Sequence, residues 1–322
     1  MIFGLIIAIY LLALVLIKSA DHVVFALRHL TKSAGGAFTI SALLLALATS
    51  FPELFVGITS ALAGSPNLSF GNVIGANIAN ISLVAGIAGL LVGRVNVHGE
   101  FLRRDVWVAL GAGVLPLIFI LDGSLSRVDG LALLAIYGAY ASSFFKRRFL
   151  EIGEEIREGA FVHRFFRTIK HIDGNKTKEA ARLFLGIAAL LLSANLIVKV
   201  AEKLAELTNL PVFLVGLILL SLGTTLPELG FSVRSLEDKE PTMFFGNLLG
   251  SLIANSTLVV GLAAVISPIK TVVLEEYFFA AVTFLIVFLV FWFFIRSKLK
   301  LERWEALVLV LIYLVFVVVE FV

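Results

Sequence analysis

Two short stretches of this chain place a glutamate directly after a proline, within otherwise apolar sequence. The first reads Ala46-Leu-Ala-Thr-Ser-Phe-Pro-Glu53, and the second reads Ser221-Leu-Gly-Thr-Thr-Leu-Pro-Glu228. A carboxylate at mid-membrane depth costs about 2.5–3.5 kcal/mol or more, so its presence indicates a function. Each proline breaks its helix and frees a backbone carbonyl, which is tolerated only where that carbonyl faces a polar cavity or an ion. Clustered oxygen atoms of this kind suit Ca²⁺ or Na⁺.

Further oxygen atoms accompany both glutamates. Hydroxyls stand in the preceding turn of each stretch, and amides follow in a second apolar segment; the residues are Thr49, Ser50, Thr224, Thr225, Asn80 and Asn255. The two amides could instead form only hydrogen bonds between helices, and each glutamate could be a buried, permanently protonated structural acid. We favour the ion-binding interpretation for the glutamates because an ionisable residue at this depth is rarely structural.

The two stretches are copies of one element. An offset of 175 positions carries Glu53 to Glu228, and it also carries Gly71-Asn72 to Gly246-Asn247 and Asn80 to Asn255 without a gap. The shared residues include most of the polar and helix-breaking ones, which is typical of a duplicated functional element. Glycines spaced four apart allow helices to approach closely, so we expect them to serve packing rather than ion binding.

The composition excludes an ordinary soluble domain. Hydrophobic residues make up 60% of the 322 positions and charged residues 15%, and the mean hydropathy is +1.03. Apolar runs of about 20 residues predict an all-α, polytopic membrane protein rather than an outer-membrane barrel. We predict ten spans, at 2–18, 36–62, 68–93, 105–122, 128–146, 182–203, 211–235, 243–267, 272–296 and 302–321.

The ten spans divide into two five-helix repeats, residues 1–148 and 182–322, joined by a linking loop at 149–181. Because five is odd, the second repeat must enter the membrane from the opposite face, so the repeats are expected to be inverted. The loop is charged and aromatic, and it could be either an amphipathic surface helix or a solvated connector.

Lysine and arginine concentrate in the loops on one side. By the positive-inside rule this side, with the linking loop, is cytoplasmic, and both termini are extracytoplasmic in a cell-membrane protein. The basic excess reports topology, so no nucleic-acid partner is expected. The chain has no cysteine, which excludes disulfides and a cysteine metal site. No nucleophile–base pair, P-loop or dinucleotide motif is present, and we expect no enzyme activity and no cofactor.

The motif Ala48-Thr-Ser-Phe-Pro-Glu53 with Gly71-Asn-Val-Ile-Gly, and its copy Gly223-Thr-Thr-Leu-Pro-Glu228 with Gly246-Asn-Leu-Leu-Gly-Ser, resembles the two α-repeats of the cation/Ca²⁺ antiporter superfamily. The resemblance is to prokaryotic sodium/calcium exchangers and covers essentially the whole chain. It implies Ca²⁺ held by Glu53, Glu228 and the main-chain oxygens of Thr49 and Thr224. It also implies flanking Na⁺ positions that use the Ala46 and Ser221 carbonyls, the Thr49 and Thr224 hydroxyls and Ser251, with Asn80 and Asn255 completing a middle position.

The sequence departs from this family at two positions: Ala76 stands where the exchangers usually have serine, and Asn255 where many have aspartate. We place Ala76 at the first-repeat Na⁺ position and Ser251 at the second, so we expect weaker Na⁺ binding at the first. Neither copy has the additional glutamate typical of proton/calcium exchangers, which favours sodium coupling.

We therefore predict an antiporter that exchanges Ca²⁺ for Na⁺ by alternating access at a midplane site. The alternatives are an antiporter on the same scaffold that is coupled to H⁺ or carries another divalent ion, and a cation channel.

Overall fold

A computed structural model describes residues 2–33, 49–97, 100–158, 176–270 and 274–321, which are almost entirely helical. The elements of the first half are α1 (Ile2–Ser33), α3 (Phe51–Leu62), α4 (Pro66–Ala79), the π-helix η1 (Asn80–Val84), α5 (Ala85–Val92), β1 (Arg94–Asn96), α6 (Glu100–Phe119), the 3-10 helix η2 (Ile120–Asp122), β2 (Ser124–Leu125) and α7 (Arg127–Glu158). Those of the second half are α9 (Lys176–Thr208), α10 (Val212–Leu214), the π-helix η3 (Val215–Leu220), α11 (Ser221–Thr224), α12 (Leu226–Glu237), α13 (Pro241–Ile253), the π-helix η4 (Ala254–Val259), α14 (Val260–Ile266), β3 (Ile269–Lys270), α15 (Leu274–Lys298), β4 (Lys300–Glu302) and α16 (Arg303–Phe321).

Seven helical segments within the described residues are long and apolar enough to cross a membrane. The other three predicted spans coincide with α7, α16 and, for the described part of 36–62, the shorter apolar helix α3. A multi-pass helical architecture is therefore confirmed, whereas the count of ten spans stays a prediction. The helices α7 and α9 also extend into the predicted linking loop, as far as Glu158 and from Lys176.

Corresponding helical hairpins in the two halves, α3–α4 and α12–α13, turn in the same way. Gly64 and Lys239 occupy equivalent positions, and both have positive φ, at 84° and 61°. In each turn the next residue closes the helix end: Ser65 N donates to Ser60 O over 2.9 Å, and Glu240 N donates to Ser235 O over 2.8 Å. This is a Schellman ending, and a proline then starts the next helix.

Two short antiparallel sheets connect the two halves. The strand β1 pairs antiparallel with β4, and β2 pairs antiparallel with β3. The 175-residue offset relates β1 to β3 and approximately relates β2 to β4, so the two sheets are equivalent contacts. Each sheet takes one strand from each half, and the halves are therefore packed into a single body.

Two glycines of α4 bring this helix against the backbone of the other half. A Cβ on Gly71 would lie 2.1 Å from the carbonyl oxygen of Phe213, and a Cβ on Gly75 would lie 1.8 Å from that of Leu217. No side chain fits at such distances, so the close approach of α4 to α10 and η3 depends on glycine. The packing interpretation of the motif glycines is confirmed at these two positions but not at Gly246 and Gly250, where an added Cβ would meet nothing within 4 Å.

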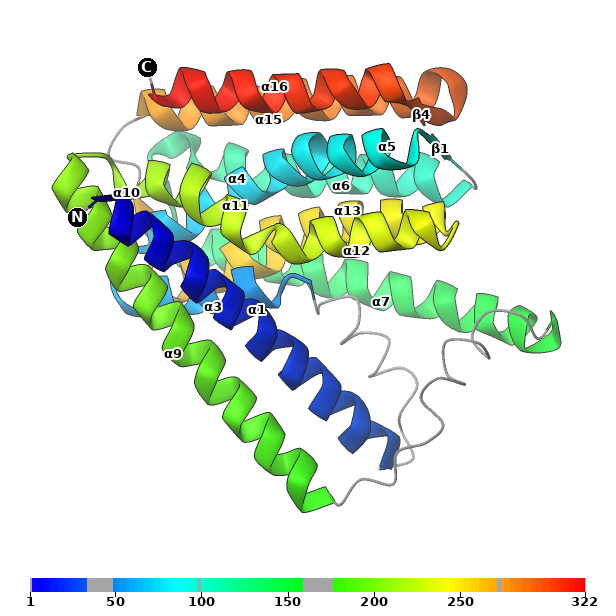
Figure 1. The fold of residues 1–322 in the computed structure, drawn as a ribbon, viewed down its shortest axis with the longest axis horizontal. Coiled ribbons are helices and arrows are strands. Elements are labelled where there is room, and N and C mark those ends of the chain that lie inside the picture. Colours follow the sequence, from blue (N-terminus) through cyan, green and yellow to red (C-terminus); the bar gives the residue numbers. More distant parts are fainter. Residues whose placement is uncertain (1, 34–48, 98–99, 159–175, 271–273, 322) are drawn as a thin grey trace.

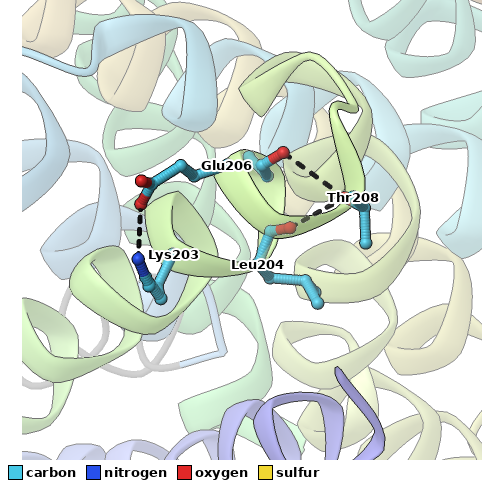
Figure 2. Close-up of polar contacts among 5 residues, drawn as sticks. Lys203, Leu204, Glu206 and Thr208 are labelled. Atoms are coloured by element: carbon cyan, nitrogen blue, oxygen red, sulfur yellow. Dashed lines mark hydrogen bonds and ion pairs between the residues drawn. The ribbon is translucent and has the colours of Figure 1, made fainter. Parts of the chain in front are cut away.

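The helices α1 and α9 lie side by side and run diagonally away from the rest of the bundle (Figure 1). With residues of α3, η3 and the start of α4 they form a second hydrophobic cluster, beside the larger cluster around α4, α5 and α13–α16. Figure 2 shows how α9 ends: Thr208 Oγ1 donates to Leu204 O over 2.7 Å, beside the exposed Lys203–Glu206 ion pair. Asn209 then has a φ of 53° and ends the helix.

Candidate ion-binding site

The residue before each Pro-Glu helix has the same backbone conformation in the two motifs, and in the second motif it separates α11 from α12. Ser50 has φ −87° and ψ 4°, and its counterpart Thr225 has φ −83° and ψ −2°. The helices α3 and α12 start at the next residue, with proline in the first turn. Proline is well suited to this position because its missing N–H has no partner there in any case. The repeated motif therefore produces a repeated local structure.

Glu53 and Glu228 lie in the first turns of α3 and α12 and are completely buried. Among the described residues no hydrogen bond of good geometry reaches any of their four carboxylate oxygens, although the Thr224 side chain interacts with the Glu53 carboxylate. The two side chains are close enough for their charges to interact. The positive end of each helix dipole favours a carboxylate here. A structural acid would have its oxygens fully hydrogen-bonded, so two buried carboxylates with so few partners support an ion-binding role.

Thr49 and Thr224 contact the opposite half of the molecule. Thr49 Oγ1 donates to Asn247 Oδ1 over 3.1 Å, and Thr224 Oγ1 donates to Asn72 Oδ1 over 3.2 Å. The 175-residue offset relates Thr49 to Thr224 and Asn72 to Asn247, so the two hydrogen bonds are equivalent contacts made in opposite directions between the halves. Asn72 and Asn247 are site residues that the sequence reasoning missed, although the recurrence of Gly-Asn in both copies was the signal that could have identified them.

Ser251 is placed differently from our expectation. Its Oγ lies 3.3 Å from Thr49 Oγ1, so this second-half hydroxyl accompanies the first-half threonine. This contact favours grouping Ser251 with Thr49, and Ala76 with Thr224, over the expected grouping of each ligand with its own repeat. The physical reason is that α13 packs its polar residues against the opposite half. By the same symmetry, the hydroxyl missing at Ala76 is missing beside Thr224.

Asn80 and Asn255 lie in π-helical segments, η1 and η4, at equivalent positions in the two halves. Such segments frequently occur at functional sites. Asn255 Nδ2 donates to Asn77 Oδ1 over 3.4 Å, and Asn77 Nδ2 donates to Ser256 Oγ over 2.7 Å. The Asn255 amide is therefore oriented, and its Oδ1 is buried without a described partner, as are both polar atoms of Asn80. Hydrogen bonding between helices thus accounts for only one of these four atoms.

The oxygen atoms of the remaining candidate ligands differ in whether they already take part in a hydrogen bond. Ser50 Oγ is buried and has no partner among the described residues. Thr225 Oγ1 instead donates to Leu222 O over 3.3 Å, and Ser221 Oγ donates to Leu217 O over 2.6 Å. The Ser221 carbonyl accepts Thr225 N over 3.0 Å. Ala46 lies outside the described residues.

The chemistry available at this site is two carboxylates surrounded by neutral oxygens. No group of three or more His, Cys, Asp or Glu residues that could hold a metal ion occurs in the described part of the chain. Carboxylate, hydroxyl and amide oxygens are ligands for hard cations. The site can therefore offer two negative charges and several lone pairs to a small cation.

Comparison with known proteins agrees with this chemistry. A family model described as "Sodium/calcium exchanger protein" matches residues 4–146 and 178–322. The chain is 28% identical to Sodium/calcium exchanger MaX1 of Methanosarcina acetivorans, with 97% of each chain covered. It is 30% identical to Inner membrane protein YrbG of Escherichia coli K12, over 79% of this chain and 78% of that protein. The sodium-calcium exchanger NCX_Mj soaked with 10 mM Na⁺ and zero Ca²⁺ has the same fold, with a TM-score of 0.60, 23% identity and 99% of each chain covered.

Proposed function

Because the chain belongs to the sodium/calcium exchanger family, we propose that it exchanges Ca²⁺ for Na⁺ across the cell membrane at a site between Glu53 and Glu228. The observation that carries this proposal is the pair of buried carboxylates with so few described partners. One Ca²⁺ neutralises both charges, and so do two or more Na⁺. Binding of one kind of ion therefore excludes the other, which is the basis of exchange.

Alternating access is proposed from the duplicated architecture. Inverted repeats can open to either side by the movement of one group of helices against another. The pair α1 and α9 is suited to this role because the two helices pack chiefly against each other and also contact the site. A Cβ on Gly223, the residue before Thr224, would lie 3.1 Å from Ala13 Cβ of α1. Movement of α1 would therefore reach the ligand-bearing segment directly.

The proposal is tested by ⁴⁵Ca²⁺ uptake into proteoliposomes with imposed gradients. We expect uptake to follow an outward Na⁺ gradient and to be insensitive to a pH gradient. Uptake driven by the pH gradient alone would favour the proton-coupled alternative. Ca²⁺ uptake without any counter-gradient would identify a channel.

Na⁺ affinity should depend on the hydroxyl beside Thr49. Ser251→Ala removes an oxygen 3.3 Å from Thr49 Oγ1, so we expect the Na⁺ concentration for half-maximal exchange to rise about tenfold. Ala76→Ser adds a hydroxyl at the equivalent position and should lower this concentration. Ca²⁺ affinity should change less in both variants because the two carboxylates remain. Unchanged Na⁺ dependence in both would contradict this assignment of ligands.

The proposed orientation places both termini outside and the linking loop in the cytoplasm. The chain has no cysteine, so single cysteines can be introduced at position 164 and near either terminus. An impermeant maleimide added to intact cells is expected to label the terminal cysteines but not position 164, which should react only after the cells are opened. Labelling of position 164 from outside would reverse the proposed topology.

A further inference from the structure

We propose that Asn72 and Asn247 are positioning residues that orient the threonine hydroxyls of the opposite half toward the bound cation. This inference rests on the proposed function, because it assigns the partners of that same site. The observations behind it are the two equivalent hydrogen bonds, Thr224 Oγ1 to Asn72 Oδ1 and Thr49 Oγ1 to Asn247 Oδ1.

The direction of these hydrogen bonds decides what each threonine can do. An amide oxygen accepts and cannot donate, so the hydroxyl proton points at the asparagine. The lone pairs of the threonine oxygen are then turned away from the asparagine and are available to a cation. Without this acceptor the hydroxyl could rotate and direct its proton into the site, where it would repel the ion.

Burial strengthens this orientation in the Thr224–Asn72 pair, whereas the Thr49–Asn247 pair is only partly buried. Thr224 is completely buried and Asn72 is 1% exposed, so water does not compete for the hydroxyl proton. The alternative acceptors for the Thr224 proton are the Ser221 carbonyl, 3.3 Å away in its own segment, and the Glu53 carboxylate, which a bound cation would occupy. Thr49 has Ser251 Oγ at the same distance. Each threonine therefore has one hydrogen bond to an asparagine of the opposite half, and at least one other group nearby to which its hydroxyl could turn if that asparagine were removed.

The pairing also connects ion binding to the relative position of the two halves. Each threonine belongs to a helix break, and its asparagine belongs to the hairpin helix of the other half, α4 or α13. The hydroxyls are aligned only while these segments are in contact. The cation affinity of such a site depends on contact between the two halves. Separating the halves would misalign both threonine hydroxyls at once.

The test is a pair of double-mutant cycles. Asn72→Leu removes the acceptor and keeps a similar volume, and Thr224→Val removes the hydroxyl. Each is expected to raise the Na⁺ concentration for half-maximal exchange by about 10- to 100-fold. The double variant should be no worse than either single variant, because both changes remove the same aligned oxygen. The Ca²⁺ concentration for half-maximal exchange should shift less.

Matched controls come from the other half. Asn72→Leu combined with Thr49→Val should multiply the two effects, since these residues are not partners. Asn247→Leu should show the opposite pattern, coupling to Thr49→Val and not to Thr224→Val. The proposal would be overturned if the two fold-changes in the Na⁺ concentration for half-maximal exchange multiplied in the partner pairs just as they do in the non-partner pairs. It would also be overturned if Asn72→Leu and Asn247→Leu left this concentration unchanged.

Ion-induced shifts of the melting temperature in detergent provide a second readout of the same cycles. They separate this inference from the proposed function, because they measure binding even if the parent protein fails to exchange Na⁺ for Ca²⁺. If Asn72→Leu does not fold, the Asn247 cycle in the other half decides the question by the same criteria.

Discussion

Replacing Glu53 or Glu228 with glutamine is expected to abolish Ca²⁺ exchange while leaving the protein folded. Each change removes one of the two buried charges that would balance Ca²⁺. Losing one partner of a buried, desolvated charge interaction costs about 2–5 kcal/mol, which is a factor of at least about 30 in affinity. Folding should tolerate the change because glutamine has nearly the same shape and relieves the repulsion between the carboxylates.

⁴⁵Ca²⁺ flux in proteoliposomes measures this effect, and the melting temperature in detergent checks folding. Glu206→Gln is a matched control because it makes the same chemical change at an exposed carboxylate whose only described ion pair is with Lys203. It should retain parental flux. Flux close to the parental value in Glu53→Gln or Glu228→Gln would contradict a shared site.

Local sequence predicted the helix breaks and the buried carboxylates because both depend on residues adjacent in the chain. Pro52 and Pro227 force a break wherever they occur in a helix interior, and a glutamate within an apolar run is costly enough that it rarely occurs without a function. The duplication then added the equivalence of the two copies. These parts of the site needed no knowledge of tertiary contacts.

The partners of those ligands were not predictable in the same way. Ser251 lies beside Thr49 and Asn72 beside Thr224 because the two halves exchange contacts across their interface. Grouping ligands by their own repeat did not anticipate the contact of Ser251 with Thr49. The π-helical segments at Asn80 and Asn255 also escaped prediction, since hydropathy does not distinguish the π-helix from the α-helix.

Hydropathy also underestimates helix length. The span 128–146 ends where the apolar residues end, yet α7 continues to Glu158. Glu151-Ile-Gly-Glu-Glu-Ile-Arg-Glu158 contains mostly good helix formers, so the backbone stays helical after the apolar stretch is complete. Hydropathy therefore locates the spans better than it locates the helix ends.

Substitution of Gly75 by alanine should cause the second large effect, a loss of folded protein. A Cβ at this position would lie 1.8 Å from the Leu217 carbonyl oxygen and 2.6 Å from Ser221 Oγ, so it would meet backbone that cannot rotate away. Overpacking of a well-packed interior costs about 1–3 kcal/mol and occasionally more. The helices would have to separate, and α4 carries Asn72 and Ala76 on either side of this contact. Transport should therefore fall together with stability.

Gly111→Ala in α6 is the matched control, because Gly111 is exposed and inside a helix. There the same substitution should be neutral or stabilise the helix by about 0.5–1 kcal/mol. We expect Gly75→Ala to lower the melting temperature and the yield of monodisperse protein, and Gly111→Ala to preserve both. Equal melting temperatures for the two variants would show that α4 and η3 do not need the close contact.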